Sequence, residues 1–384
     1  MHRLGSPPPD TGSATPLVSL TTFRSGLPGL LSSWFVARVL TLLALGVVVQ
    51  LSPGHIPHPP TLSVYDAHTY QLIAGHGYSA GLVRYFPLFP LAIRGLSRVL
   101  PLGPPGAALL VSNVAALGYA TLLWFLIRSD IEPRLPGTKA SIADATVWLT
   151  ILAPVGFVLV LGYSEALFGL LAVLVFLLLR RRHFAWAVIP GILVGLSRPV
   201  GLLLAVPAAV EALRAWRGTR LTTRAWATLA VLAPVAGCAG YLAWVASTYG
   251  NPMLPFTDQV HGPRASLFAD PLAPLHHSVV ALLHATDPVT ILHLPVVLIF
   301  VALLGVSARR LPLSYTAFAG VMLAAALTAR TLDSLERYCY SDFPLIIALA
   351  LSTRRRTATL LAVSISAGLL VFYSVLTLTG HYTP

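Results

Sequence analysis

Long apolar runs alternate with short polar segments along most of the chain. Because about 20 apolar residues in a helix cross the hydrocarbon layer of a membrane, each run of that length predicts a transmembrane helix. Arg38 lies near the start of the first run, where its side chain is expected to snorkel toward the interface. The predicted spans are residues 30–51, 106–127, 141–161, 163–179, 226–246, 290–308, 312–329, 338–352 and 358–378.

One further apolar stretch, residues 184–210, does not fit a simple crossing. Basic clusters lie at both of its ends, and Ser197-Arg198-Pro199 stands in its middle. A proline disfavours helical backbone at the residue before it, so Arg198 is expected to interrupt the helix. The sequence therefore predicts a re-entrant hairpin of two half-helices, with Arg198 at its tip inside the membrane.

The segment 52–105 is too long and too regularly patterned for a simple connection between two spans. Apolar positions at helical spacing from Tyr65 to Ala74 predict an amphipathic helix at the membrane interface. Asp66 is expected at the positive N-terminal end of this helix. Residues 1–28 are rich in Ser, Pro, Thr and Gly, so they are predicted to form a disordered cytoplasmic tail, followed by a single membrane domain over residues 29–384.

The composition agrees with a membrane protein. Hydrophobic residues make up 56% of the 384 residues and charged residues only 10%, with a mean hydropathy of +0.79. A soluble domain carries about 25% charged residues, and a disordered chain is far less apolar, so both classes are excluded. The sequence predicts an all-α polytopic fold with about 9–10 transmembrane helices and the re-entrant hairpin.

The net charge of +12 reflects short basic clusters between apolar runs rather than a nucleic-acid-binding surface. If all clusters are cytoplasmic, the positive-inside rule gives a multi-pass plasma-membrane protein with a cytoplasmic N-terminus. Most remaining acids then face outward, and the segment 52–105 is the first extracytoplasmic loop. The clusters are Arg128, Arg134 and Lys139; Arg180 to Arg182; Arg214, Arg217, Arg220 and Arg224; Arg309 and Arg310; and Arg354 to Arg356.

The chain contains five short sequence motifs. They are Asp66 to Tyr78 with Phe86 to Pro90, Gly162 to Phe168, Ser197 to Gly201, Tyr249 to Gln259, and Glu336 to Tyr338. In residue types and in order, they resemble the PIG-V-like mannosyltransferases, the GPI mannosyltransferase II family of the GT-C glycosyltransferases. Two positions depart from that pattern: Tyr65 stands where Trp is common, and His261 to Arg264 stand where bacterial relatives often have Trp-Gly-Arg.

The resemblance implies transfer of a sugar, expected to be mannose, from a polyprenyl-phosphate donor with inversion at the anomeric carbon. The expected acceptor is a lipid, glycan or exported protein at the outer face of the membrane. Because the arginine-rich composition indicates a bacterium, which lacks GPI anchors, an actinobacterial cell envelope is the expected setting. Neither a cofactor nor nucleic acid is expected, and no spacing typical of a metal site occurs.

This reaction needs a base for the attacking hydroxyl and cations for the leaving phosphate. Asp66 is the candidate base. Arg84, Arg198 and Arg337 are the guanidinium groups available for the phosphate, which arginine can bind in a bidentate manner. The other candidates for substrate contact are His68, Tyr70, Tyr85, Glu165 and Gln259.

Each charged candidate also has a purely structural explanation. Asp66 can cap its helix, Glu165 can be an ion-pair partner, and Arg198 can satisfy carbonyls at the hairpin tip. Arg84 can snorkel to lipid headgroups, and Arg337 can form a surface pair with Glu336.

Two other functions remain open at this stage. A transporter or flippase of a lipid-linked saccharide would also use broken helices and intramembrane arginines, although no second copy of the Asp66 or Arg198 segment is found. A non-catalytic subunit of a cell-envelope assembly complex is the other alternative.

Overall fold

The computed structural model describes residues 19–51, 62–135, 141–257, 288–327 and 335–382. Over these ranges the chain forms fifteen α-helices and no β-strand. Five helices are long and apolar enough to cross a membrane, which supports a multi-pass membrane protein. These are Thr21–Gln50, Pro104–Arg134, Pro199–Trp216, Leu221–Tyr249 and Arg356–Leu378.

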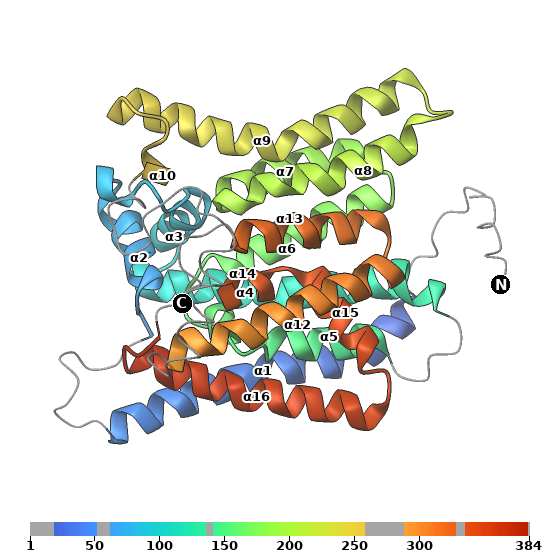
Figure 1. Ribbon diagram of the computed structural model, residues 1–384. Coiled ribbons are helices and arrows are strands. Elements are labelled where there is room, and N and C mark those ends of the chain that lie inside the picture. Colours follow the sequence, from blue (N-terminus) through green and yellow to red (C-terminus); the bar gives the residue numbers. More distant parts are fainter. Residues whose placement is uncertain (1–18, 52–61, 136–140, 258–287, 328–334, 383–384) are drawn as a thin grey trace.

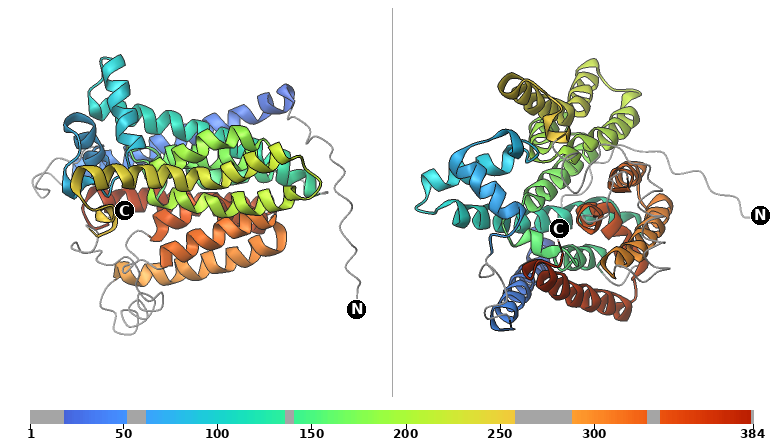
Figure 2. Two further views of the ribbon diagram at one scale, coloured as in Figure 1. Left: turned by 90° about the horizontal axis from the view of Figure 1, so that it is seen from above. Right: turned by 60° about the vertical axis from the view of Figure 1, so that its left-hand side comes forward.

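The long helices lie side by side in layers (Figure 1). One outer layer contains α7 (Phe184–Ser197), α8 (Ala205–Trp216) and α9 (Leu221–Tyr249), and the opposite side contains α1 (Leu20–Leu51) and α16 (Arg356–Leu378). Figure 2 shows the same arrangement from two further directions. Between these layers lie α4 (Pro104–Leu126), α5 (Ile142–Ile151), α6 (Glu165–Arg180), α12 (Pro288–Arg310), α13 (Leu313–Leu327), α14 (Leu335–Ser341) and α15 (Phe343–Ser352).

Three shorter helices gather at one end of the bundle, at the left in Figure 1. They are α2 (Asp66–His76), α3 (Leu88–Val99) and α10 (Leu254–Thr257). The helix predicted from Tyr65 to Ala74 therefore exists and begins at Asp66. Short 3₁₀ segments lie at Ala80–Leu82, Glu132–Arg134, Gly156–Leu159 and Pro199–Leu204, and a π-helical turn follows α4 at Ile127–Ile131.

The helix α1 begins earlier than the sequence indicated. Residues 20–28, predicted to belong to a disordered tail, are helical, whereas residues 1–18 lie outside the described part of the chain. The Ser19 Oγ accepts a hydrogen bond from the Thr22 N–H at 3.2 Å. Such an N-cap satisfies one of the amide groups that a helix start leaves without an internal partner.

Two predicted spans are interrupted by prolines. The span 141–161 is α-helical only as α5, which ends at Ile151, because Pro154 cannot continue the α-helix and constrains the residue before it. The 3₁₀ segment Gly156–Leu159 follows the break. The span 338–352 is divided into α14 and α15 at Asp342, two residues before Pro344.

Arg38 does not snorkel to the interface as predicted. It is buried, and its Nη2 donates to the Leu159 carbonyl at 3.0 Å while its Nε donates to Asn113 Oδ1 at 2.7 Å. The Asn113 amide in turn donates to the Val160 carbonyl at 3.0 Å. The break after α5 exposes these carbonyls, and buried carbonyls need donors, so Arg38 is held inside the bundle.

The segment 184–216 turns back on itself. Its two helices, α7 and α8, meet around Arg198, where the backbone is extended, and η5 (Pro199–Leu204) leads into α8. Arg180, just before α7, donates to Glu211 near the end of α8 at 2.7 Å. The two ends of the segment therefore lie at the same end of the bundle, and Arg198 lies at the turn between them.

Glycines allow α7 and α9 to pack closely. A Cβ at Gly195 would meet the Pro234 carbonyl oxygen at 2.0 Å, and a Cβ at Gly237 would meet the Ile192 carbonyl oxygen at 2.1 Å. Small residues at a helix interface allow this backbone approach in membrane proteins. The close packing fixes the position of α7, and with it the position of Arg198.

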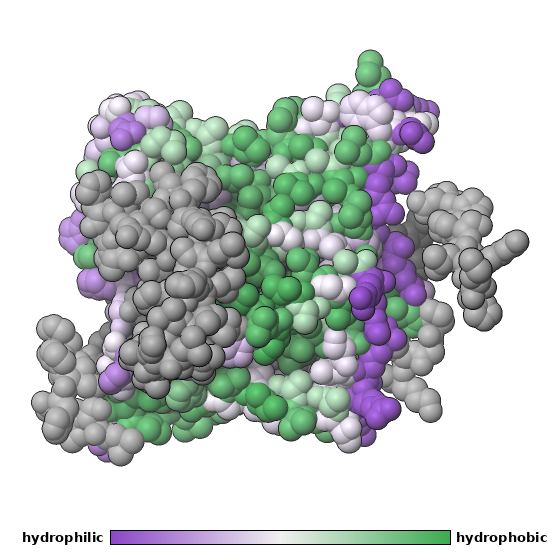
Figure 3. All heavy atoms as spheres, in the orientation of Figure 1, coloured by the Kyte–Doolittle hydropathy of each residue, from purple (hydrophilic) through white to green (hydrophobic). Residues whose placement is uncertain are grey.

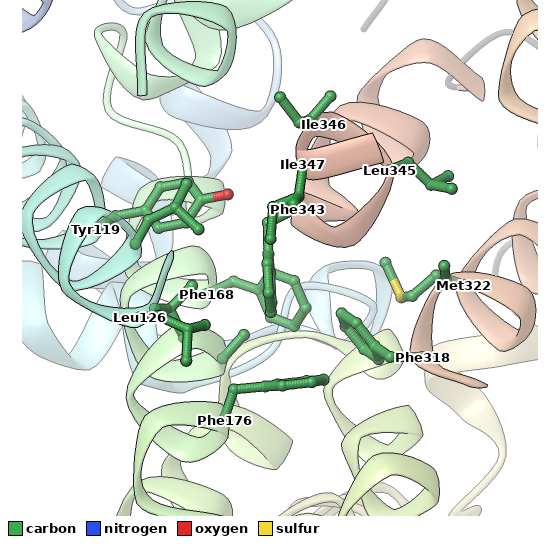
Figure 4. Close-up of a cluster of buried hydrophobic side chains, with 14 of the residues drawn as sticks. Tyr119, Leu126, Phe168, Phe176, Phe318, Met322, Phe343, Leu345, Ile346 and Ile347 are labelled. Atoms are coloured by element: carbon green, nitrogen blue, oxygen red, sulfur yellow. The ribbon is translucent and has the colours of Figure 1, made fainter. Parts of the chain in front are cut away.

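The core between the layers is filled by aromatic and branched side chains from several helices. Phe168 and Phe176 of α6 pack with Phe318 of α13 and Phe343 of α15 (Figure 4). Tyr119 of α4 borders the same cluster, with its ring facing α15. These contacts join α4, α6, α13 and α15 into one packed unit.

The surface separates polar from apolar side chains. A broad hydrophobic region covers the middle of the face shown in Figure 3, and a hydrophilic band follows the end opposite α2 and α3. Buried and half-buried ion pairs lie at that end, since Arg180 contacts Asp130 at 2.8 Å and Glu211 at 2.7 Å. The band coincides with the turns that carry the arginine clusters between α6 and α7, α8 and α9, and α15 and α16.

Candidate active site

The candidate base stands at a strained helix start. Tyr65, directly before Asp66, has a φ of 48°, which non-glycine residues adopt only when their surroundings enforce it. This conformation turns the chain abruptly into α2. The Asp66 side chain is 17% exposed, so its carboxylate remains accessible from outside the bundle.

Both carboxylate oxygens of Asp66 have partners from distant segments. The Tyr85 hydroxyl donates to Oδ1 at 3.0 Å, and Arg337 Nη1 donates to Oδ2 at 2.7 Å. Burial, followed by the nearby Asp66 charge, raises the pKa of Tyr85, which keeps its phenol protonated as a donor. Asp66 therefore makes tertiary contacts through its side chain, in addition to starting α2.

Arg337 also connects Asp66 to a second carboxylate. Its Nε lies 2.6 Å from Glu165 Oε1, and Arg198 Nη1 pairs with the same oxygen. Glu165, Arg198 and Arg337 are only 3%, 5% and 7% exposed. Asp66, Arg337, Glu165 and Arg198 thus form a continuous ion-paired cluster, here called the Asp66–Arg198 cluster, with two carboxylates and two guanidinium groups.

A tight turn places Glu165 in this cluster. Gly162 has a φ of 70°, and a Cβ there would approach the Ala108 Cβ at 3.2 Å, so both its conformation and its packing favour glycine. The chain then enters α6 with Glu165 as the first residue, where a carboxylate is favoured by the helix dipole.

Aromatic side chains surround the charged groups. The Arg337 guanidinium lies 5.7 Å from the centre of the Tyr163 ring, and the Arg198 guanidinium lies 5.7 Å from the centre of the Tyr338 ring. Aromatic faces stabilise guanidinium groups within about 6 Å. These rings also limit the freedom of both arginines, because they leave few positions for each side chain.

Tyr70 connects α2 to the start of α6. Its hydroxyl is hydrogen-bonded to Ser164 Oγ at 2.9 Å, and its ring packs edge-on against Tyr85 and Phe89. Burial, and then the Asp66 charge, raise the pKa of Tyr70. Tyr70 is 5% exposed, so its role in the structure is to hold α2 against the bundle.

The remaining predicted residues lie outside the cluster or cannot be placed. Arg84 is exposed, and its guanidinium lies 5.1 Å from the centre of the Tyr85 ring, with Nη2 3.3 Å from the Tyr85 hydroxyl. His68 is on the exposed side of α2. Gln259 and His261 to Arg264 lie outside the described residues.

Several predicted roles are now distinguished by geometry. Glu165 is an ion-pair partner of two arginines, and Arg198 pairs with Glu165. Arg337 does not form a surface pair with Glu336, because both residues are buried and the Glu336 Oε2 accepts instead from Tyr382 at 3.2 Å.

Three further residues of the site, Tyr163, Ser164 and Tyr338, are not among those predicted from the sequence. Ser164 directly precedes Glu165, Tyr163 stands one position earlier, and Tyr338 directly follows Arg337. Their closeness to a charged residue in an apolar part of the chain could have identified them as site residues, because a buried guanidinium or carboxylate needs partners nearby.

The described residues contain no group of three or more His, Cys, Asp or Glu side chains with the geometry of a metal site. These residues offer one partly exposed carboxylate, Asp66, held by the buried Arg337 guanidinium, and one exposed guanidinium, Arg84, which lies at the Tyr85 ring.

No protein-family model matches the chain, and no curated protein matches it in sequence.

Proposed function

We propose that this protein is a membrane glycosyltransferase that uses a polyprenyl-phosphate sugar, with mannose as the expected sugar. The acceptor is a hydroxyl group of a lipid, glycan or exported protein at the outer face of the plasma membrane. The observation that carries the proposal is the position of Asp66, an accessible carboxylate held by buried Arg337 at the end of the bundle where α2 and α3 gather.

Asp66 is the general base. The acceptor oxygen attacks the anomeric carbon as the bond from that carbon to the phosphate oxygen breaks, and the bonding electron pair leaves with the phosphate. The acceptor proton passes to an Asp66 carboxylate oxygen. The products are an inverted glycoside and a polyprenyl phosphate.

Arg84 is the best-placed residue for the donor phosphate. It is exposed and is held over Tyr85, which in turn contacts Asp66. A guanidinium can bind two phosphate oxygens and stabilise the charge that develops on the leaving group. Arg198 and Arg337 are buried and engaged with carboxylates, so we assign them to positioning Asp66 rather than to phosphate binding.

We place this end of the bundle outside the cell. The arginine-bearing turns lie at the opposite end, where the positive-inside rule expects the cytoplasm. Under this orientation α7 runs outward from the cytoplasmic end and η5 and α8 return to it, so the tip of the hairpin, Arg198, lies beside Glu165 at the outer start of α6. The shorter apolar helices then complete a GT-C-like set of about 9–10 transmembrane segments.

The test is transfer of labelled mannose from polyprenyl-phosphate mannose by membranes that contain the wild type or Asp66→Asn. We expect Asp66→Asn to lower transfer by about 100-fold or more, in line with the loss of a general base. Asp144→Asn is the matched control, since Asp144 is half-exposed at the far end of the bundle, beside Arg128. Monodisperse elution and an unchanged melting temperature would establish that both variants fold.

Equal transfer by wild type and Asp66→Asn would remove Asp66 from catalysis. Absence of transfer by the wild type, with glycolipid, glycan and exported-protein acceptors each supplied, would contradict the glycosyltransferase proposal. Uptake or flipping of the labelled lipid in the same vesicles would then support a transporter.

A further inference from the structure

A small cavity extends from the Asp66–Arg198 cluster into the bundle. Glu165 and Arg337 form part of its wall, and so does Gly169, which lies one turn further along α6. The wall also includes Tyr119 of α4 and Thr150 of α5. The space open to water-sized molecules is ≈ 20 Å³.

Two hydroxyl groups in this wall have no hydrogen-bond partner among the described residues. They are the Tyr119 phenol and the Thr150 Oγ1, which belong to side chains that are 3% and 2% exposed. Most buried polar groups in proteins are hydrogen-bonded, and leaving one without a partner is costly. Two such groups on one cavity indicate a polar occupant.

A third group of this kind lies next to the cavity wall. Asp342 directly follows Ser341 of the wall, is fully buried, and has no hydrogen-bond partner for either carboxyl oxygen among the described residues. Polar groups without partners among the described residues are therefore concentrated in and beside this cavity wall.

The size of the space limits the occupant. A buried water needs about 10–15 Å³ of such volume and two to four polar partners, whereas cavities with apolar walls stay dry. The cavity therefore has enough room for a water molecule. Its wall supplies the Tyr119 and Thr150 hydroxyls together with the charged groups of Glu165 and Arg337.

We propose that this cavity is an internal water-binding site. An ordered water bridges the Tyr119 and Thr150 hydroxyls and hydrates the inner side of the Glu165–Arg337 pair. Such hydration lowers the cost of keeping that ion pair inside the bundle, and so helps to hold Arg337 in contact with Asp66. The proposal does not depend on glycosyl transfer.

The first test compares two isosteric substitutions in the purified full-length protein. Thr150→Val removes a hydroxyl from the cavity wall, whereas Thr377→Val removes a hydroxyl that is also buried and without a partner but lies outside the wall. If water binds Thr150, Thr150→Val lowers the Tm by about 1–3 °C. Thr377→Val leaves the Tm unchanged or raises it, because it only removes an unsatisfied group.

Tyr119→Phe is expected to lower the Tm in the same way. An increase of the Tm in both Thr150→Val and Tyr119→Phe would mean that the hydroxyls are dry, and would overturn the proposal.

The second test is labelling by hydroxyl radicals generated from water by X-rays, which marks buried side chains that adjoin bound water. Tyr119 is compared with Tyr315, which is fully buried, donates to Asp130 at 2.9 Å and does not line the cavity. We expect labelling of Tyr119 to exceed that of Tyr315 several-fold. Equal, background labelling of both tyrosines would contradict the water site even if the Tm values agreed with it.

Discussion

Arg337 and Asp66 are separated by 271 positions in the chain, yet Arg337 Nη1 donates to Asp66 Oδ2 at 2.7 Å. The same guanidinium contacts Glu165 through Nε at 2.6 Å. A rigid, planar fork of donors is suited to holding two carboxylates at once, which an ammonium group cannot do with the same geometry. Arg337 is therefore the residue that joins the first loop, the start of α6 and α14 at the candidate site.

Arg337→Lys is expected to keep the protein folded but to weaken transfer. A lysine retains the positive charge between Asp66 and Glu165 but not the two-sided geometry, so the base is less well oriented and kcat falls by about 10- to 100-fold. The KM for the donor should change much less, because Arg337 is buried and does not reach the outside. Steady-state kinetics in nanodiscs measure both constants.

Arg337→Gln provides the comparison for this prediction. It leaves two carboxylates near each other without their shared cation, and breaking a buried pair costs about 3–5 kcal/mol, so the Tm should also fall strongly. Unchanged kcat in Arg337→Lys would show that Arg337 has only a structural role.

Arg84→Gln is expected to raise the KM for the lipid-phosphate donor by about 10-fold, while the Tm stays unchanged. A charged hydrogen bond to phosphate contributes about 1.5–3 kcal/mol to the binding free energy, and solvent weakens it at an exposed position such as Arg84, which gives the lower end of this range. Arg98→Gln is the matched control, since Arg98 is an exposed arginine near the end of α3. Equal KM values in the two variants would mean that Arg84 only interacts with lipid headgroups.

Arg180→Gln should destabilise the protein without acting on the chemistry. Arg180 is 8% exposed at the end of the bundle opposite α2, and it holds Asp130 and Glu211 through three short contacts. Its loss removes the buried cation shared by two buried carboxylates, so Asp130 keeps only Arg134 and Tyr315 and Glu211 keeps only Arg214 at 3.8 Å. Breaking such a pair costs up to about 3–5 kcal/mol, so the Tm falls. The kcat per folded molecule should equal that of the wild type, and a kcat loss similar to that of Arg337→Lys would contradict the assigned location of the site.

Gly195→Ala tests whether helix packing positions Arg198. The added methyl group would meet backbone atoms of Pro234 and Cys238, so α7 and α9 must separate, at a cost of about 1–3 kcal/mol. The expected result is a lower Tm together with reduced transfer, because Arg198 at the end of α7 moves relative to Glu165. Gly240→Ala in α9 is the control, since a Cβ there has no neighbour within 4 Å. Equal effects of the two substitutions would argue against packing control.

Local features of the sequence determined much of the fold. Apolar runs define helices because the bilayer and the bundle interior both exclude charge. A proline interrupts the helix at Arg198-Pro199, whereas Pro190 and Pro234 lie inside α7 and α9. The helix that starts at Asp66 was also predictable, because the spacing of apolar positions that indicates it is a local feature of the sequence. The breaks at Ile151 and Asp342 each lie shortly before a proline, Pro154 or Pro344. The continuous hydrophobicity of these segments led to a prediction of unbroken spans.

Only the tertiary structure decided which charges pair. From the sequence, Arg38 could equally well lie at the interface. The break after α5, more than a hundred residues later, leaves the carbonyls of Leu159 and Val160 without helical partners. Arg38 and Asn113 donate to these carbonyls and so lie inside the bundle. Arg337 has Glu336 as its neighbour in the chain but bonds Asp66 and Glu165, because the packing of α14 against α13 and α15 directs its side chain there. A buried charge takes whichever partner the fold brings within hydrogen-bonding distance, and that distance depends on how the helices pack, which no local sequence pattern encodes.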